Sequence, residues 1–316
     1  MKRRAAIIGA GISGLTTAIV LGELGYEPVI FADRLPLNTT SAVAGAIWFP
    51  YDVTPEDLVN AWAFFTFGRL LDFAKFRASG VSLTDFEILS QSDTIEIPRW
   101  TEAIGYRRME RRELRFPFLS GYSITVPKME TPRYLPYLVN RIKRLGGSIN
   151  KIDRLARIED LKKDKFSVVI NCSGFGAKEL VPDHDVTAHN GQILVVPKSN
   201  RRNAMVCADP LTYVIPRASD CVLGGMNAKE EDQEELPADS VNQIIERCKA
   251  AGFDESCAVL SDPVGERPYR KSGVRVQAGW TRDKRLVIHN YGHGGCGLSL
   301  SWGCAQKVRE LVETFT

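Results

Sequence analysis

A turn with three glycines stands near the start of the chain, between two segments of different periodicity. The apolar run at 5–8 is typical of a buried strand, and from Ile12 onward apolar residues recur at helical spacing. Gly9, Gly11 and Gly14 fit GxGxxG, in which the first glycine makes a tight turn, the second lets the backbone approach a pyrophosphate and the third lets the helix pack closely on the strand. The pattern predicts a strand, a turn and a helix whose N-terminus faces an anion.

An acidic residue follows at a matching distance. The segment "PVIFADR" (28–34) reads as a second strand, and Asp33 lies nineteen positions after Gly14, where an acidic side chain accepts hydrogen bonds from a ribose. Each observation has a plainer interpretation, because such glycines occur in ordinary strand-to-helix turns and Asp often ends a strand. Together they predict a dinucleotide site.

NAD and FAD share this fingerprint, so the choice of cofactor depends on two further segments. The segment "LNTTSAVAGAIW" (37–48) is rich in hydroxyl and small side chains, which suits backbone passing close to phosphates and a flavin ring. A second Gly-rich turn at 292–297 brings another helix N-terminus to the cofactor. Both features favour FAD. His293, in this second turn, would be the general base of an NAD-dependent dehydrogenase; we favour a structural histidine bonded to backbone.

The remaining segments predict an α/β fold with two domains. The run "SVVINCSGFG" (167–176) is typical of a central parallel strand, whereas short strand-like segments between 188 and 226 indicate a mostly antiparallel sheet. A length of 316 residues favours two cores. We expect a Rossmann-like FAD-binding domain interleaved with a substrate domain built on a mixed, mostly antiparallel β-sheet. The expected FAD-binding domain comprises 1–50, 130–182 and 277–316, and the expected substrate domain comprises 51–129 and 183–276.

Composition restricts partners and compartment. The 41 Lys and Arg against 38 Asp and Glu give a net charge of +3, too small and dispersed to indicate nucleic acid. Strand-like sequence begins within the first few residues and no apolar run reaches bilayer length, so neither a signal peptide nor a membrane span is expected. Seven cysteines without CxxC spacing indicate no metal site or disulfide framework, which favours a reducing, cytoplasmic location.

The chain resembles the D-amino-acid oxidase family of FAD enzymes. The resembling stretches run in the family's order from end to end, and the final one is the most specific: "IIGAGISGLTTAIVL", "FADR", "TTSAVAGAIWFPY", "VINCSGFGAKELVPD", "LTYVIPR", "GERPYRKSGVRV" and "VIHNYGHGGCGLSLSWGCA". The resemblance implies oxidative deamination of D-amino acids to 2-oxo acids, ammonia and hydrogen peroxide, by hydride transfer from the substrate Cα to flavin N5. The implied partners are an amino-acid substrate and dioxygen, with no nucleic acid and no membrane; the chain identifies no interface for a homo-oligomer.

The resemblance also implies roles for individual residues. Arg275 matches the arginine whose guanidinium fork binds the substrate carboxylate, Tyr213 the tyrosine that contacts the same carboxylate, and Gly295 the glycine whose carbonyl accepts from the amine. The residues expected at the cofactor are Gly9, Gly11, Ile12, Ser13, Gly14, Asp33, Arg34, Thr39, Thr40, Ser41, Ala46, Ile47, Trp48, Ile152, Ser173, Gly174, Gly294, Gly295, Cys296, Gly297, Leu298 and Ser299.

Several positions depart from the family pattern. Glu266 replaces an apolar or aromatic residue, Cys296 replaces the tyrosine of animal members, and Phe49 replaces their glutamine. The segment "ADPLT" (208–212) is too short for the active-site lid of the animal enzymes, so the chain resembles compact bacterial members more closely. These differences affect the expected side-chain preference of the substrate.

Other functions remain open at this stage. The nearest alternative is another amine-oxidising flavoenzyme that acts on glycine, an N-methyl or cyclic amino acid, D-aspartate or an L-amino acid, as an oxidase or a dehydrogenase. More distant alternatives are an NAD-dependent dehydrogenase and a flavin-binding protein without catalysis. The carboxylate clamp argues against the last, because a protein that only holds flavin needs no such clamp.

Overall fold

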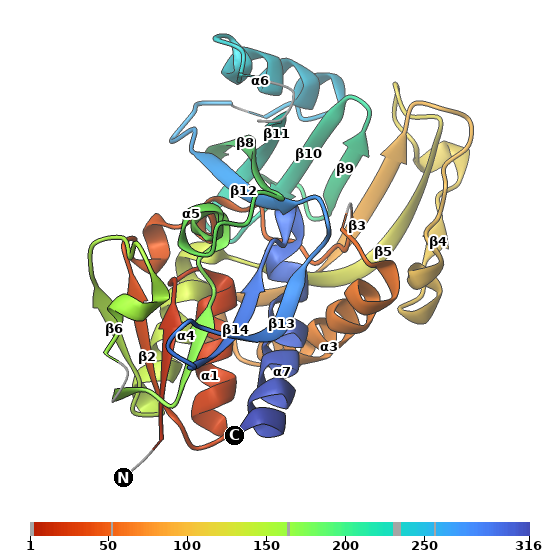
Figure 1. The fold of residues 1–316 in the computed structure, drawn as a ribbon. Helices are drawn as coiled ribbons and strands as arrows, with labels where there is room; N and C mark the ends of the chain where they lie inside the picture. The colour runs from red at the N-terminus through yellow and green to blue at the C-terminus, as the bar shows by residue number, and fades with distance from the viewer. Residues whose placement is uncertain (1–2, 52, 163–164, 230–234, 256) are drawn as a thin grey trace.

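The protein is described by a computed structural model, which covers residues 3–51, 53–162, 165–229, 235–255 and 257–316. Two β-sheets organise the chain, and Figure 1 shows them as two lobes, with both termini at the end of the molecule away from α6 (Ser240–Ala250). Each sheet contains strands from distant parts of the sequence. The two lobes are therefore interleaved along the chain.

The first sheet has six strands in the order β13-β14-β7-β1-β2-β6. Its neighbouring strands are parallel, except that β13 runs antiparallel to β14. The strands are β1 (Arg4–Ile8), β2 (Glu27–Ala32), β6 (Ser148–Lys151), β7 (Val168–Asn171), β13 (Arg275–Trp280) and β14 (Leu286–Tyr291). All four residues of β7 are buried, as expected for a central parallel strand.

The second sheet has eight strands in the order β12-β8-β11-β10-β9-β3-β5-β4. Neighbours are antiparallel except β3 and β9, which are parallel. The strands are β3 (Val81–Ser90), β4 (Arg107–Arg108), β5 (Ser120–Met129), β8 (Val186–Pro197), β9 (Ala204–Ala208), β10 (Leu211–Pro216), β11 (Asp220–Lys229) and β12 (Val264–Arg270). The predicted α/β class with a mixed, mostly antiparallel second sheet is confirmed.

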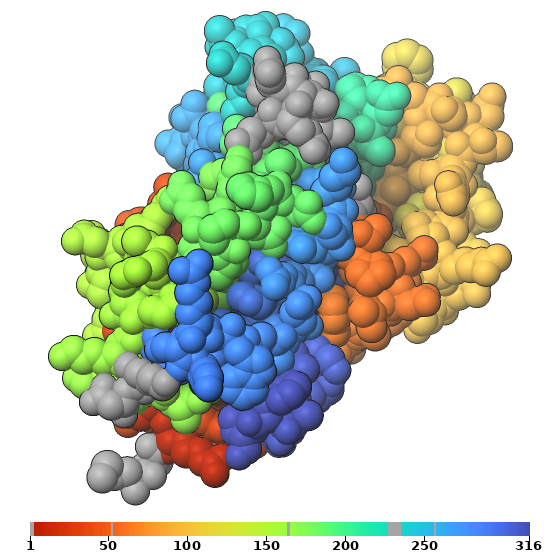
Figure 2. Space-filling view, viewed as in Figure 1, coloured from red at the N-terminus to blue at the C-terminus, as the bar shows by residue number. Residues whose placement is uncertain are grey.

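Helices α1 (Ile12–Glu23) and α7 (Gly297–Phe315) pack on the first sheet, whereas α3 (Glu56–Ala74) contacts strands β3 and β5 of the second. The α-helices besides α6 are α1 (Ile12–Glu23), α2 (Thr40–Val43), α3 (Glu56–Ala74), α4 (Thr131–Arg144), α5 (Ala177–Leu180) and α7 (Gly297–Phe315). Helix α7 packs against both α1 and α3, and Figure 2 shows the orange surface of α3 beside the dark blue surface of α7. Helices α7 and α3 approach closely because Gly303 has no side chain. A Cβ there would lie 2.2 Å from the Trp62 carbonyl oxygen.

The expected division into domains stays a prediction. Most elements follow it, but β13 begins at Arg275, two positions before the expected boundary at 277, and pairs with β14 in the first sheet. Among the described residues, no helix is both long and apolar enough to cross a membrane.

Candidate active site

The first Gly-rich turn places the N-terminus of α1 at the end of β1. Gly9 has φ +105°, and a Cβ there would lie 2.4 Å from the Cys172 carbonyl oxygen. A Cβ at Gly14 would lie 2.0 Å from the Gly9 carbonyl oxygen, so only glycine allows this separation of helix and strand. Gly11 is the N-cap of α1 and has no side chain to satisfy the first free N–H groups. The turn therefore has the geometry predicted for close backbone approach to a phosphate.

A cavity of about 890 Å³ begins at this turn and extends to the second sheet. Its walls come from the turn at 9–13, the segment 39–47, the turn at 172–176 and the second Gly-rich turn at 293–299. Residues of β10 and β12 line it on the side of the second sheet. The cavity thus joins the two Gly-rich turns, as the sequence predicts, and its volume suits a large cofactor together with a small ligand.

Charged and hydroxyl side chains gather where the cavity meets β2. Asp33 follows β2 directly and pairs with Arg154, whose Nε lies 3.2 Å from Asp33 Oδ2. Arg34 Nη1 lies 3.7 Å from Glu266 Oε2. Ser41 Oγ accepts from the Ile12 N–H at 3.0 Å, which ties the hydroxyl-rich segment to the first turn of α1. This part of the cavity can hold a ribose and phosphates.

An arginine and a tyrosine converge above glycines of the second sheet. Arg267 projects from β12 across β8, where a Cβ at Gly191 would lie 2.3 Å from Arg267 Nη2. Tyr213 projects from β10 across β11, where a Cβ at Gly224 would lie 2.1 Å from the Tyr213 ring. The two side chains interact, since the Arg267 guanidinium favours the charged form of the Tyr213 phenol. Glycines on the intervening strands therefore form the surface on which guanidinium and phenol lie.

The wall near this pair is largely apolar. Val206, Ile215 and Phe49 line the cavity, and the Phe49 ring packs edge-on against Phe86 at a centroid distance of 5.4 Å. Tyr51 reaches from the other side, where a Cβ at Gly295 would lie 2.2 Å from the Tyr51 hydroxyl oxygen. A ligand here meets one polar pair, a tyrosine hydroxyl, a glycine backbone and hydrophobic side chains.

Burial determines the protonation of the titratable groups beside the cavity. It raises the pKa of the Tyr213 phenol, although the Arg267 charge opposes the shift. It lowers the pKa of His293 to about 4, and His293 Nε2 lies 3.1 Å from Asn290 Oδ1. His293 is therefore neutral near pH 7 and held by a side chain of β14, which supports a structural histidine.

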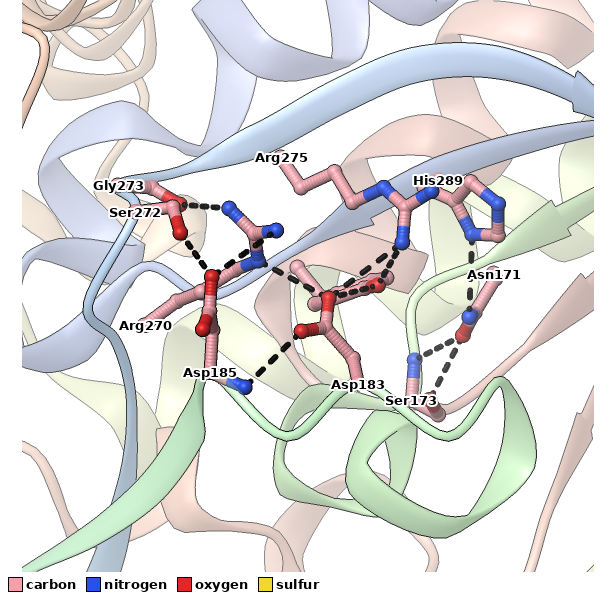
Figure 3. A network of polar contacts seen from close by, with 10 residues as sticks. Asn171, Ser173, Asp183, Asp185, Arg270, Ser272, Gly273, Arg275 and His289 are labelled. Atoms are coloured by element: carbon pink, nitrogen blue, oxygen red, sulfur yellow. Dashed lines mark hydrogen bonds and ion pairs between the residues drawn. The ribbon is translucent and has the colours of Figure 1, made fainter.

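Arg275, the predicted contact of the substrate carboxylate, is not among the residues that line this cavity. Its Nη1 donates to the Tyr291 hydroxyl at 2.6 Å and lies 3.4 Å from Asp183 Oδ2. Arg270 Nε donates to the same carboxylate oxygen at 3.0 Å. Figure 3 shows the two arginines approaching Asp183 from opposite sides. Arg275 belongs to the first sheet through β13, so its side chain stabilises a junction between segments instead of facing the ligand space.

Four further predicted cofactor residues do not line the cavity. Gly14 contacts Gly9, which is a packing role. Trp48 is fully buried and donates through Nε1 to the Ala63 carbonyl oxygen. Cys296 is also fully buried, and its thiol donates to the Tyr51 carbonyl oxygen at 2.8 Å. Ile152 pairs through its N–H with Ala32.

The other predicted residues lie at the cavity. Those that line it are Gly9, Gly11, Ile12, Ser13, Asp33, Arg34, Thr39, Thr40, Ser41, Ala46, Ile47, Ser173, Gly174, Tyr213, Gly294, Gly295, Gly297, Leu298 and Ser299. Sequence reasoning missed Arg267, Tyr51 and Arg154, which also line it. Arg267 stands in the same segment as Arg275, "GERPYRKSGVRV", and is the one of the two that lines the cavity.

The cavity joins two glycine turns, with an acidic residue after β2 at one end and a guanidinium at the other. This arrangement defines a dinucleotide-dependent enzyme for a small anionic ligand. Residues 4–311 match the DAO family, described as FAD dependent oxidoreductase. The chain belongs to this family.

Characterised relatives cover nearly the whole chain. A D-amino-acid oxidase of Rubrobacter xylanophilus is 36% identical over 315 residues, which are 98% of this chain and 95% of that protein. A D-amino-acid oxidase of Streptomyces coelicolor is 34% identical and covers 97% of this chain and 95% of its own length. The D-aspartate oxidase of Homo sapiens is also 34% identical, with 98% and 94% covered.

Solved structures share the fold at lower identity. The glycine oxidase of Bacillus cereus superposes with a TM-score of 0.78 at 17% identity and covers 100% of this chain and 96% of its own. The iminodiacetate oxidase of Chelativorans sp. superposes with a TM-score of 0.79 at 19% identity, with 98% and 95% covered. At such low sequence identities, the similarity to these structures shows that the chain has the same fold.

The Asp183 junction generates a pH-dependent prediction. Burial by itself raises the pKa of the Asp183 carboxyl, but hydrogen bonds from Tyr291 and Arg270 and the charge of Arg270 hold the pKa below its ordinary value. A lowered pKa contributes stability that is present above the unfolded value of about 3.9 and is lost as pH falls through the folded value. Asp183→Asn should lower the free energy of unfolding by about 2 kcal/mol at neutral pH.

Urea unfolding followed by circular dichroism at pH 7 and near pH 3 measures this effect. The difference between Asp183→Asn and the parent should shrink at the lower pH. Asp185→Asn is the matched control, because Asp185 is 42% exposed and lies 3.7 Å from Arg270 Nη2, so its loss should change stability by less than about 1 kcal/mol. An equal deficit for Asp183→Asn at both pH values contradicts the assignment.

Proposed function

We propose that this FAD-dependent oxidoreductase is a D-amino-acid oxidase, which converts D-amino acids, water and dioxygen into 2-oxo acids, ammonia and hydrogen peroxide. The observation that carries the proposal is the pair Arg267 and Tyr213, whose interacting side chains line the cavity that begins at the Gly-rich turn. Relatives named D-amino-acid oxidase at 34–36% identity over nearly the full chain support it.

The residues at the other end of the cavity fit FAD. We assign the pyrophosphate to the turn at 9–13, because Gly11, the N-cap of α1, has no side chain to cover the helix N-terminus, where Ser41 takes up only the Ile12 N–H. Asp33, already oriented by Arg154, would accept from the ribose hydroxyls. The flavin ring would lie along the second Gly-rich turn, where Gly295, Gly297 and the N-terminus of α7 line the cavity.

Arg267 replaces Arg275 as the proposed carboxylate clamp. A guanidinium presents parallel N–H donors that match a carboxylate, and the Tyr213 hydroxyl adds a donor beside it. Because Gly191, Gly224 and Gly225 lie beneath this pair, the two donors stay above the sheet and point to the same space. The Gly295 carbonyl on the opposite wall would accept from the substrate amine. These contacts fix the carboxylate and the amine of the substrate, so its Cα–H bond can point in only one direction.

The proposed reaction needs no protein base at Cα. When bound, FAD supplies the hydride acceptor. As the hydride leaves Cα, the lone pair of the neutral amine forms the C=N bond, and water then releases the 2-oxo acid and ammonia. Dioxygen is the final two-electron acceptor and becomes hydrogen peroxide. The buried His293 stays neutral and bonded to Asn290, so we give it no part in proton removal.

The charges around the cavity favour substrates with uncharged side chains over D-aspartate. A second carboxylate requires a second cation close to the clamp. Of the other lining arginines, Arg34 faces Glu266 and Arg154 faces Asp33. Phe49 and Ile215 offer apolar contacts instead.

We further propose a cytoplasmic location. No disulfide joins the seven cysteines, all of which lie in the part of the chain that the structure describes, and six of them are buried. Cysteines outside disulfides suit a reducing compartment. Fractionation of cells followed by immunodetection tests this placement, and recovery with an oxidising compartment contradicts it.

Anaerobic flavin spectra test the activity. Purified holoenzyme should show the oxidised flavin spectrum and bleach on addition of D-alanine or D-valine, with no bleaching by the L-enantiomers. Admission of oxygen should restore the spectrum and produce hydrogen peroxide in an amount equal to the 2-oxo acid. Bleaching by L-enantiomers, or by no amino acid in the panel, contradicts the proposal.

Paired arginine variants test the clamp. Arg267→Gln should keep FAD but lower kcat/KM for D-alanine by about 100-fold, because it removes charge-assisted hydrogen bonds to the carboxylate. Arg275→Gln should leave kcat/KM within about threefold of the parent, since it loses only the contacts with Asp183 and Tyr291. The opposite ranking returns the clamp to Arg275.

Gly191→Ala tests the glycine surface beneath the clamp. The added methyl group would collide with the Arg267 guanidinium, which is flexible enough to move, so stability should change little while KM for D-alanine rises about tenfold or more. Gly279→Ala is the matched control in β13, where the nearest atom to an added Cβ lies at 3.7 Å. An unchanged KM in Gly191→Ala shows that the Arg267 position is not critical.

A further inference from the structure

A second cavity, of about 480 Å³, lies beside strands of the second sheet and carries strong positive charge. It shares no lining residue with the cofactor cavity. Its wall combines the start of β3, the end of β5, the first turn of α4 and the turns that follow β8 and β10. Seven basic residues and one acidic residue line it: Arg77, Lys128, Arg133, Lys198, Arg201, Arg202, Arg217 and Glu130. We call this cavity the basic pocket.

Three of the seven cations have acidic partners. Arg133 pairs with Glu130 at 3.2 Å, Arg201 with Glu87 at 2.8 Å, and Arg217 with Asp220 at 2.5 Å. In the part of the chain that the structure describes, the other four, Arg77, Lys128, Lys198 and Arg202, have no carboxylate within ion-pair distance. The basic pocket therefore has positive charge that the protein itself does not neutralise.

Lys128 is the buried member of this group. Its side chain is about nine-tenths buried, and its ammonium donates to the Pro216 carbonyl oxygen. Burial lowers the pKa of Lys128, while the charge of Glu130 opposes the shift. An ammonium has three N–H donors, and the carbonyl uses one. A buried cation without a contacting carboxylate is unfavourable, and an anion in the basic pocket would relieve that cost.

We propose that the basic pocket binds a small, multiply charged phosphate compound. Four cations without acidic partners favour an occupant with more than one negative charge. Arginine forks and lysine ammonium groups are the side chains that bind phosphate oxygens best. The volume lies in the range of pockets that hold whole small molecules, so the occupant extends beyond a single phosphate group.

The basic pocket adjoins the wall of the cofactor cavity. Lys128 forms a β-bridge with Ile47, and Ile47 lines the cofactor cavity. Pro216, which accepts from Lys128, follows Ile215, another residue of that cavity. An occupant of the basic pocket would thus lie behind the wall of the cofactor cavity, at a site separate from the FAD phosphates.

Calorimetric titration of the holoenzyme with sodium pyrophosphate tests the proposal. The flavin spectrum of the protein and of its filtrate, recorded before and after, separates binding here from displacement of FAD. The informative variant is Lys198→Gln with Arg202→Gln, because both side chains are exposed and have no acidic partner in the described residues. The matched control, Lys143→Gln with Arg144→Gln, removes the same charge from an exposed site at the other end of α4.

The parent holoenzyme should bind pyrophosphate with retained FAD, and the Lys198/Arg202 variant should bind it at least about tenfold more weakly. The Lys143/Arg144 control should bind within about twofold of the parent. If the parent holoenzyme gives no heat of binding up to about 1 mM pyrophosphate, the proposal is overturned. Equal weakening in both variants overturns it too, because that result reports general charge screening instead of a site.

Discussion

The contact between Gly14 and the Gly9 carbonyl is the constraint on which the cofactor end of the protein depends. A Cβ at Gly14 would lie 2.0 Å from that oxygen, so any other residue would push α1 away from β1. The separation determines where the first N–H groups of α1 point, and Asp33 and the segment 39–47 are arranged around that point. Backbone packing, not side-chain chemistry, therefore creates the end of the cavity to which we assign the phosphates.

The proposed clamp uses glycine in the same way on a different element. Arg267 and Tyr213 lie over strands whose residues at those points are Gly191, Gly224 and Gly225. The sheet thus provides a shallow surface at which two long side chains meet. The chain alternates between the two sheets, so that strands of the second sheet come between strands of the first in the sequence. This alternation brings the surface to the Gly-rich turns.

Much of the fold and of the cofactor end could be predicted from the sequence because the signals are local. The spacing of Gly9, Gly11 and Gly14, and the position of Asp33 after a strand, each lie within one βαβ unit. Gly25 follows the C-cap of α1 with φ +91°, a backbone conformation that favours glycine and ends the helix.

The clamp could not be predicted in this way. Arg267 and Arg275 stand in one short segment, but β12 pairs with β8 in the second sheet and β13 with β14 in the first. Which arginine reaches the cavity depends on this change of sheet and on the space above Gly191, which lies far away in the sequence. Arg154 was missed for a similar reason, since its role depends on contact with Asp33 across 121 positions.

The central claim is that one cavity holds the cofactor at the glycine turns and the substrate carboxylate at Arg267. The most direct measurement is a crystal structure of the holoenzyme with benzoate, a planar carboxylate that has no oxidisable amine. We expect both carboxylate oxygens to lie within hydrogen-bond distance of the Arg267 guanidinium and one of them also to contact the Tyr213 hydroxyl, with the aromatic ring between the apolar wall and the flavin. Benzoate bound at Arg275, or bound in the cavity without contact to Arg267, would contradict it.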